Sequence, residues 1–153
     1  MTAPLESWKV LPHGQLTEVD DNVWTVTGTI HMPVGDFERR MTVVRLRDGG
    51  LVVYSAIALD EPQMARLDSL GRMAWLVVPG DDHRLDAKPW LQRYPTMYVA
   101  APAGAREKAL EALRKVHGGD WRGCRAERQR GLDGALIGVD TAGLARRRPA
   151  CSR

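Results

Sequence analysis

The chain lacks a long hydrophobic run. None of its apolar stretches approaches the roughly 20 residues that a membrane-spanning helix needs. The first ten residues, MTAPLESWKV, have neither a basic start nor an apolar centre. The sequence therefore predicts no membrane segment and no secretory signal, and by default a cytoplasmic protein.

Cysteine is also scarce. Cys124 and Cys151 are the only two among 153 residues, and they form no C-x-x-C spacing. This argues against a cysteine-based structural zinc site and against a disulfide framework. The sequence also contains no Gly-x-Gly-x-x-Gly string and no P-loop, so nucleotide binding has no support.

Positive charge is unevenly distributed along the chain. Residues 1–104 carry 10 Lys and Arg against 13 Asp and Glu, whereas residues 105–153 carry 12 against 6. The basic character thus belongs to the C-terminal segment and cannot provide a basic groove on the body. Its Arg-rich tail over residues 119–153 could contact nucleic acid through counterion release. The tail shows neither regularly spaced aromatic residues nor a helical periodicity, however, so nucleic acid is not an expected partner.

The strongest local signal is a β-hairpin. The turn Asp48-Gly49-Gly50 separates the apolar runs at residues 41–47 (MTVVRLR) and 51–54 (LVVY), a pattern typical of two antiparallel strands. A further strand is expected at residues 23–26. The stretch 31–40 contains Pro and Gly and is expected to be a loop.

Helices and strands alternate after this hairpin. A helix is expected to start after Asp60 as its N-cap and to stop at Gly71. Two more helices are expected at residues 87–93, with Asp86 as cap, and at residues 106–116. Buried strands are expected at residues 74–78 and 97–101. This order predicts an α/β fold with a mixed sheet and crossover connections.

The composition changes after Gly119. Residues 120–153 are rich in Arg, Gly and Ala and contain one aromatic residue, Trp121. Such a segment buries too little apolar surface to offset its ordering entropy. We therefore expect a domain over residues 1–118 and a poorly ordered basic tail over residues 119–153.

The loop after the strand at 74–78 is the main candidate for chemistry, because ligands of α/β sheets bind at the carboxyl ends of strands. Three carboxylates and a histidine fall within residues 81–86. Imidazole nitrogen and carboxylate oxygen suit a divalent transition metal, which makes Asp82, His83 and Asp86 candidate metal ligands. The alternative is that Asp86 caps the following helix and that Asp81 and Asp82 are solvated turn residues.

The other polar candidates have ordinary structural interpretations. His13 and His31 lie in loops containing Pro and Gly and are expected to be exposed. His117 precedes two glycines at a helix end, where it favours the helix dipole. Ser55 follows a strand but has no G-x-S-x-G context, so a nucleophile elbow is not predicted.

The order of these elements resembles the first half of the metallo-β-lactamase-like hydrolase fold. The shared features are the hairpin with an Asp-Gly-Gly turn, a helix ending in Leu-Gly, a hydrophobic strand, a His/Asp-rich loop and the pair at residues 94–95, Tyr-Pro. The family motif after the strand is H-x-H-x-D-H. Aligned on the Tyr-Pro pair, Asp82 and His83 match its last two residues, while Val78 and Gly80 occupy the earlier histidine positions.

A bacterial group of this superfamily, known as a domain of unknown function, is the nearer resemblance. It is carried by the strings WKVLPHG at residues 8–14, RRMTVVRL at 39–46, VVP at 77–79 and HRLD at 83–86. The resemblance implies the N-terminal half of an αβ/βα sandwich. Because that group's chains run longer, it also implies a truncated or frame-shifted product.

Two functions follow as expectations. The resemblance implies a metallo-hydrolase-like protein with a degenerate metal motif, weakly active or inactive as this chain, that binds zinc or another divalent metal weakly. The alternative is a non-catalytic module for binding or oligomerisation. Half of such a sandwich exposes a sheet face, and large apolar patches drive association with a partner or with a second copy.

Overall fold

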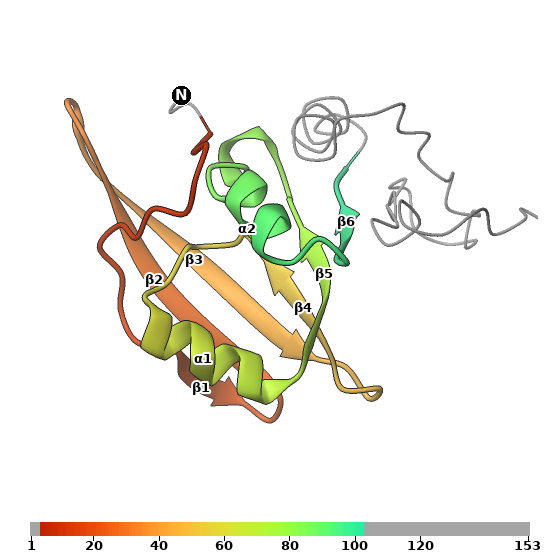
Figure 1. Cartoon of the computed structure of the whole chain (residues 1–153). Helices are drawn as coiled ribbons and strands as arrows, with labels where there is room; N and C mark the ends of the chain where they lie inside the picture. The colour runs from red at the N-terminus through yellow and green to blue at the C-terminus, as the bar shows by residue number, and fades with distance from the viewer. Residues whose placement is uncertain (1–3, 103–153) are drawn as a thin grey trace, which may run out of the picture.

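The computed structural model describes residues 4–102, which form one mixed sheet with helices (Figure 1). Its six strands follow one another in sequence order: β1 (Thr17–Asp20), β2 (Val23–Met32), β3 (Gly35–Arg45), β4 (Gly50–Tyr54), β5 (Arg72–Val77) and β6 (Tyr98–Ala100). The helical elements are α1 (Glu61–Leu70), the 3₁₀ turn η1 (Asp81–His83) and α2 (Ala87–Arg93). The predicted α/β class with a mixed sheet is confirmed.

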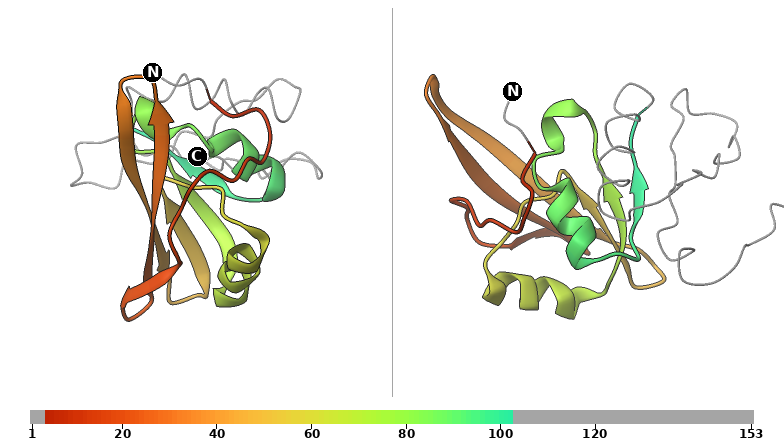
Figure 2. Two further views of the ribbon diagram at one scale, coloured as in Figure 1. Left: turned by 90° about the vertical axis from the view of Figure 1, so that its left-hand side faces the viewer. Right: turned by 45° about the horizontal axis from the view of Figure 1, so that its top comes forward.

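Strand direction changes in the middle of the sheet. The pairs β1–β2, β2–β3 and β3–β4 are antiparallel, whereas β4–β5 and β5–β6 are parallel. Parallel neighbours need a crossover connection, and α1 and α2 lie in those two connections. Both helices lie on the same face of the sheet, as the edge-on view in Figure 2 shows.

The hydrophobic core lies between this face and the helices. Alternate residues of the strands point into it, as the pleat requires. The largest side chains that are almost completely buried there come from the sheet, the helices and the connecting segments: Leu16, Met41, Leu51, Ile57, Leu59, Met64, Leu67, Leu76, Trp90, Leu91 and Met97.

Helix α1 begins and ends where the sequence predicts. The Asp60 side chain accepts a hydrogen bond from the backbone N–H of Gln63 at 3.0 Å, which satisfies a free donor of the first turn. Gly71 ends the helix with an extended backbone. A Cβ atom there would lie 2.3 Å from the carbonyl oxygen of Gly49, so the chain approaches the hairpin turn too closely for any side chain.

The predicted loop over residues 31–40 is wrong. This stretch forms the outer part of a long hairpin, in which Met32 pairs with Gly35 and only Pro33 and Val34 lie outside the strands. Gly35 has a φ of 135°, which glycine adopts without steric cost. Proline and glycine therefore mark a tight turn here. The edge strand β1 was not predicted, since its four residues are all exposed and show no apolar alternation.

The later elements agree more closely with the sequence. Helix α2 has the predicted bounds, and β5 and β6 differ from the predicted strands by one or two residues. Asp86 precedes α2, but its side chain makes no capping hydrogen bond, so that part of the prediction is wrong. The expected helix at 106–116, the boundary at 118 and the tail at 119–153 lie outside the described residues.

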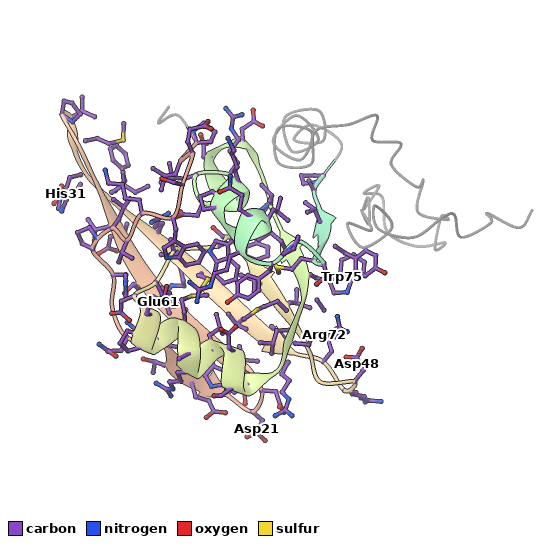
Figure 3. The ribbon with its side chains drawn as sticks, viewed as in Figure 1. Asp21, His31, Asp48, Glu61, Arg72 and Trp75 are labelled. Atoms are coloured by element: carbon purple, nitrogen blue, oxygen red, sulfur yellow. The ribbon has the colours of Figure 1, made fainter. Side chains whose placement is uncertain are left out.

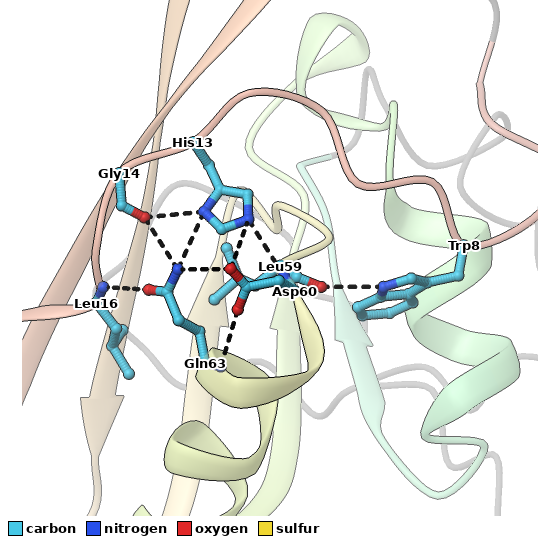
Figure 4. Close-up of polar contacts among 7 residues, drawn as sticks. All are labelled: Trp8, His13, Gly14, Leu16, Leu59, Asp60 and Gln63. Atoms are coloured by element: carbon cyan, nitrogen blue, oxygen red, sulfur yellow. Dashed lines mark hydrogen bonds and ion pairs between the residues drawn. The ribbon is translucent and has the colours of Figure 1, made fainter.

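The N-terminal segment is anchored to α1 by a buried polar cluster (Figure 4). The His13 ring, whose side chain is 5% exposed, donates through Nδ1 to the carbonyl oxygen of Gly14 at 2.8 Å and accepts at Nε2 from the backbone N–H of Asp60 at 3.2 Å. The Gln63 side chain accepts from the N–H of Leu16 at 2.6 Å. The expectation that His13 is exposed is therefore wrong, and its role here is structural.

Within residues 4–102, no helix has the length and apolar character that crossing a membrane requires.

Candidate functional site

A pocket of about 680 Å³ lies at the carboxyl ends of β4 and β5. The two strands are parallel, so the segments that follow them, Ser55–Ala56 and the η1 turn, meet at one edge of the sheet. The outer part of hairpin β2–β3 forms the facing wall. The apolar side chains that line the pocket are Ile30, Met32, Phe37, Tyr54, Ala56 and Leu85.

Ser55 and His83 form the polar centre of this pocket. The Ser55 Oγ atom lies 2.8 Å from the His83 Nδ1 atom, and both residues line the cavity. Ser55 is almost fully buried, at 6% exposure, whereas the His83 side chain is exposed. The two groups are 28 positions apart in sequence and meet because β4 and β5 are neighbours in the sheet.

Ser55 also has an unusual backbone. Its φ is 55°, in the left-handed region, and Asn22 is the only other non-glycine residue of the described part with a positive φ. Asparagine tolerates this region well and Asn22 lies in a turn, but serine at a strand end does not usually adopt it. The strain is held in place by the backbone, since the Ser55 N–H donates to the carbonyl oxygen of Val77 at 3.0 Å.

Arg39 and Asp86 form a buried ion pair beside the pocket. The Arg39 Nη1 atom donates to the Asp86 Oδ2 atom, and the other carboxylate oxygen accepts from the backbone N–H of Ala58 at 3.2 Å. Burial raises the pKa of the Asp86 carboxyl group, and the nearby Arg39 guanidinium partly opposes this rise. The Nε and Nη2 atoms of Arg39 are buried and make no hydrogen bond in the described part of the chain.

Gly28 provides the space that Arg39 occupies. It is the cross-strand partner of Arg39, and a Cβ atom at this position would lie 3.4 Å from the Arg39 Nε atom and 3.1 Å from the Ile57 Cδ1 atom. A side chain at this position would require the Ile57 side chain to shift by a few tenths of an ångström.

The structure separates the three predicted metal ligands. Asp82 and His83 line the pocket, and both are exposed. Asp86 has no exposed surface, does not line the pocket, and uses both carboxylate oxygens within the protein. Asp81 also lines the pocket, and its carbonyl oxygen accepts from Arg84 Nε at 3.1 Å.

The donor set does not fit a complete zinc centre. Across residues 4–102, no group of three or more His, Cys, Asp or Glu side chains is placed to hold a metal ion. Structural zinc needs four protein ligands and catalytic zinc usually three. Asp82 and His83 are adjacent candidates in the pocket, which Asp81 and Glu38 also line.

His31 lies away from this arrangement. It projects outward from hairpin β2–β3 (Figure 3), where its Nδ1 atom is 2.6 Å from the Asp36 Oδ1 atom, and its side chain is 64% exposed as expected. Sequence reasoning did not select Ser55 or Arg39 for a site. The only available signal for Ser55 was its position directly after an apolar strand.

No family model matches the chain, and no curated protein matches it. Among solved structures, the chain is similar to the metallo-β-lactamase FIM-1 from Pseudomonas aeruginosa in its mono-zinc form, with 20% identity and a TM-score of 0.47 over 68% of this chain and 48% of that one. A metallo-β-lactamase from Hirschia baltica matches with 15% identity and a TM-score of 0.47, over 65% and 48% of the two chains. Both come from the family that the sequence resembles, and the likeness is one of fold. The chain spans about half the length of each.

Proposed function

We propose that this chain is a metallo-hydrolase-like protein with a degenerate metal motif, whose pocket binds a small, largely apolar molecule. The observation that carries the proposal is the pocket itself, which is lined by six apolar side chains and by charged ones such as Glu38, Arg40 and Arg84, and which holds one hydrogen-bonded pair, Ser55 and His83. Ligand pockets commonly combine a mostly apolar lining with a few placed polar groups, and they form at the carboxyl ends of sheet strands.

A metal ion contributes little to this proposed binding function. Asp82 and His83 supply at most two donors, and a zinc ion held by two side chains binds weakly and exchanges readily. Where it binds, zinc supplies a Lewis acid that polarises an oxygen atom. The binding of an apolar molecule does not depend on it, because the apolar lining consists of side chains that are not metal ligands: Ile30, Met32, Phe37, Tyr54, Ala56 and Leu85.

The binding site can be tested by NMR with butyrophenone, an aryl ketone that stands in for an apolar ester. Methyl signals of Ile30 and Met32, which line the pocket, should shift on titration. The signal of Met64, a residue of α1 that is completely buried in the core and does not line the pocket, should stay in place.

Two variants sharpen this test. Phe37→Ala removes a pocket wall and should weaken binding several-fold. Val34→Ala changes a residue of the hairpin turn that is 81% exposed and does not line the pocket, so it should bind as the wild type does. Equal affinity in both variants, or shifts confined to other parts of the sheet, would contradict the proposal.

A second candidate function is self-association through the face of the sheet that α1 and α2 leave open. The rings of Trp75 and Tyr98, which are register partners on β5 and β6, stack with centroids 4.9 Å apart. Val52 pairs with Trp75, and the pair Tyr54 and Val77 lies on the same face, with Tyr54 at 45% exposure. Exposed apolar patches of this kind favour association.

The occupant proposed for this face is a second copy of the chain. Sedimentation velocity should show a concentration-dependent dimer that Trp75→Lys abolishes. Phe37→Lys, at the pocket on the hairpin, should leave it unchanged. A monomer at all concentrations would remove this candidate and leave the pocket proposal intact.

A further inference from the structure

We propose that Ser55 is a nucleophile and His83 its general base, so that the pocket cleaves small apolar carboxylic esters by forming an acyl-serine intermediate. This inference rests on the proposed pocket and names its chemistry. It assigns the reaction to the side chains of Ser55 and His83, and no step requires a metal ion.

The first support is the geometry of the pair. A serine hydroxyl is a weak nucleophile until a base within hydrogen-bond reach takes its proton. The Ser55 Oγ atom lies 2.8 Å from the His83 Nδ1 atom, inside that range. In the neutral tautomer protonated at Nε2, the His83 Nδ1 atom presents a lone pair that can accept the Ser55 hydroxyl proton.

The second support is the backbone of Ser55. Strained conformations that persist at the end of a central strand often mark functional positions. The strand itself does not need a serine here, because the N–H of Ser55 already completes the pairing with Val77. Glycine would adopt a φ of 55° with less strain. What serine adds over glycine is the hydroxyl group, and that group points at His83.

The third support is access from the pocket. Ser55 is largely buried while His83 is exposed, and both line the cavity. A substrate in the cavity therefore lies beside both residues. The apolar side chains of Ile30, Met32 and Phe37 suit a hydrocarbon acyl or aryl group.

The reaction balances with water as the only co-reactant. Oγ of Ser55 attacks the carbonyl carbon of the ester while its proton moves to Nδ1 of His83. The bond from that carbon to the alcohol oxygen breaks, and the alcohol leaves with the proton from His83. A water molecule then attacks the acyl-serine, giving its proton to His83. The carboxylic acid leaves, and the proton returns to Ser55.

The test uses the full chain in EDTA with a fluorophosphonate, which phosphonylates activated serines, followed by intact mass measurement and peptide mapping. One adduct per chain is expected, located at Ser55. Ser55→Ala and Ser55→Gly should both give none, and the glycine variant removes the hydroxyl while relieving the backbone. His83→Ala should slow labelling at least tenfold. Ser69→Ala, which changes an exposed serine of α1, should label as the wild type does.

A second readout separates a catalytic from a structural role. With 4-nitrophenyl butyrate, the wild-type protein should release nitrophenol and carry a butyryl group on Ser55 that is trapped by rapid acid quenching. Absence of both adducts while butyrophenone still binds the pocket would overturn the nucleophile and leave the proposed binding function standing. Labelling at an unchanged rate in His83→Ala would overturn the assignment of the base.

Discussion

Arg39 of β3 and Asp86 before α2 are joined in a buried ion pair although they are 47 positions apart in sequence. The pair connects the middle of the long hairpin to the segment that follows His83. The Asp86 side chain is completely buried, and that of Arg39 is 13% exposed. The relative position of the two pocket walls therefore depends on this contact.

Asp86→Ala should destabilise the domain by about 3–5 kcal/mol, because it leaves the Arg39 charge buried without its partner. Urea unfolding followed by circular dichroism measures the change. Asp82→Ala, at an exposed position of η1, is the matched control and should change stability by less than about 0.5 kcal/mol.

A double variant tests the reason for that loss. Arg39→Met combined with Asp86→Leu removes both charges, and replacing a buried pair by apolar groups is often neutral or stabilising. It should recover most of the stability lost in Asp86→Ala. If the double variant is as unstable as the single one, the loss comes from packing or from the hydrogen bond to Ala58, and the charge argument is wrong.

Zinc should bind weakly and below one ion per chain, and its retention should depend on His83. The reason is that no third side chain of the described residues is placed with Asp82 and His83 to complete a site, and Asp86 is engaged with Arg39. Elemental analysis of the purified protein before and after His83→Ala measures this. His31→Ala, which changes an exposed histidine on the hairpin, is the control. One or more tightly held zinc ions that survive His83→Ala would place the metal site elsewhere.

The sequence predicted features that depend on neighbouring residues. The turn at Asp48-Gly49-Gly50, the N-cap at Asp60 and the bounds of α2 are all confirmed, because each depends on the conformational preferences of a few adjacent residues. Asp86 was different. Its position before a helix suggested a cap, but its side chain instead binds Arg39 on the distant strand β3. No pattern among the neighbouring residues identifies that partner.

In the candidate site, too, the features that depend on neighbouring residues were predicted and the contacts between distant residues were not. The loop at 81–86 was selected for its composition, and Asp82 and His83 do line the pocket. The contact between Ser55 and His83 could not be predicted, since it requires both the pairing of β4 with β5 and the left-handed backbone at Ser55.

In the apolar run of β5, the sequence also could not show which residues face the core: Leu76 is completely buried, whereas Trp75 and Val77 are half-buried.

The ion pair between Glu61 and Arg93 should make stability depend on pH in the acid range. Arg93, in the last turn of α2, donates to both oxygens of Glu61 in the first turn of α1, at 2.6 and 2.9 Å. The hydrogen bonds from Arg93 hold the pKa of Glu61 below its ordinary value of 4.5. A carboxyl group whose pKa is lowered by folding stabilises the protein above its unfolded pKa, and this contribution is lost as the pH falls through the folded pKa.

Glu61→Gln should therefore lower the melting temperature near neutral pH, and the difference from the wild type should shrink below about pH 4. Thermal melts of both proteins across this range provide the measurement. Glu18→Gln, at an exposed position of β1, should show no such convergence. A difference that stays constant down to acid pH would mean that the Glu61 charge is not what stabilises the contact between the helices.

Gly71→Ala tests the close approach between the end of α1 and the hairpin turn. The new Cβ atom would lie 2.3 Å from the carbonyl oxygen of Gly49, which is backbone and cannot rotate away. Either the turn or the start of β5 must shift, and overpacking of this kind costs about 1–3 kcal/mol.

Gly80→Ala is the matched control, because its nearest contact would be the His83 ring at 3.8 Å and its backbone is extended. Denaturant unfolding should show a clear loss for Gly71→Ala and almost none for Gly80→Ala. Equal stability of the two variants would mean that the hairpin turn accommodates the new methyl group without cost, which would contradict the prediction.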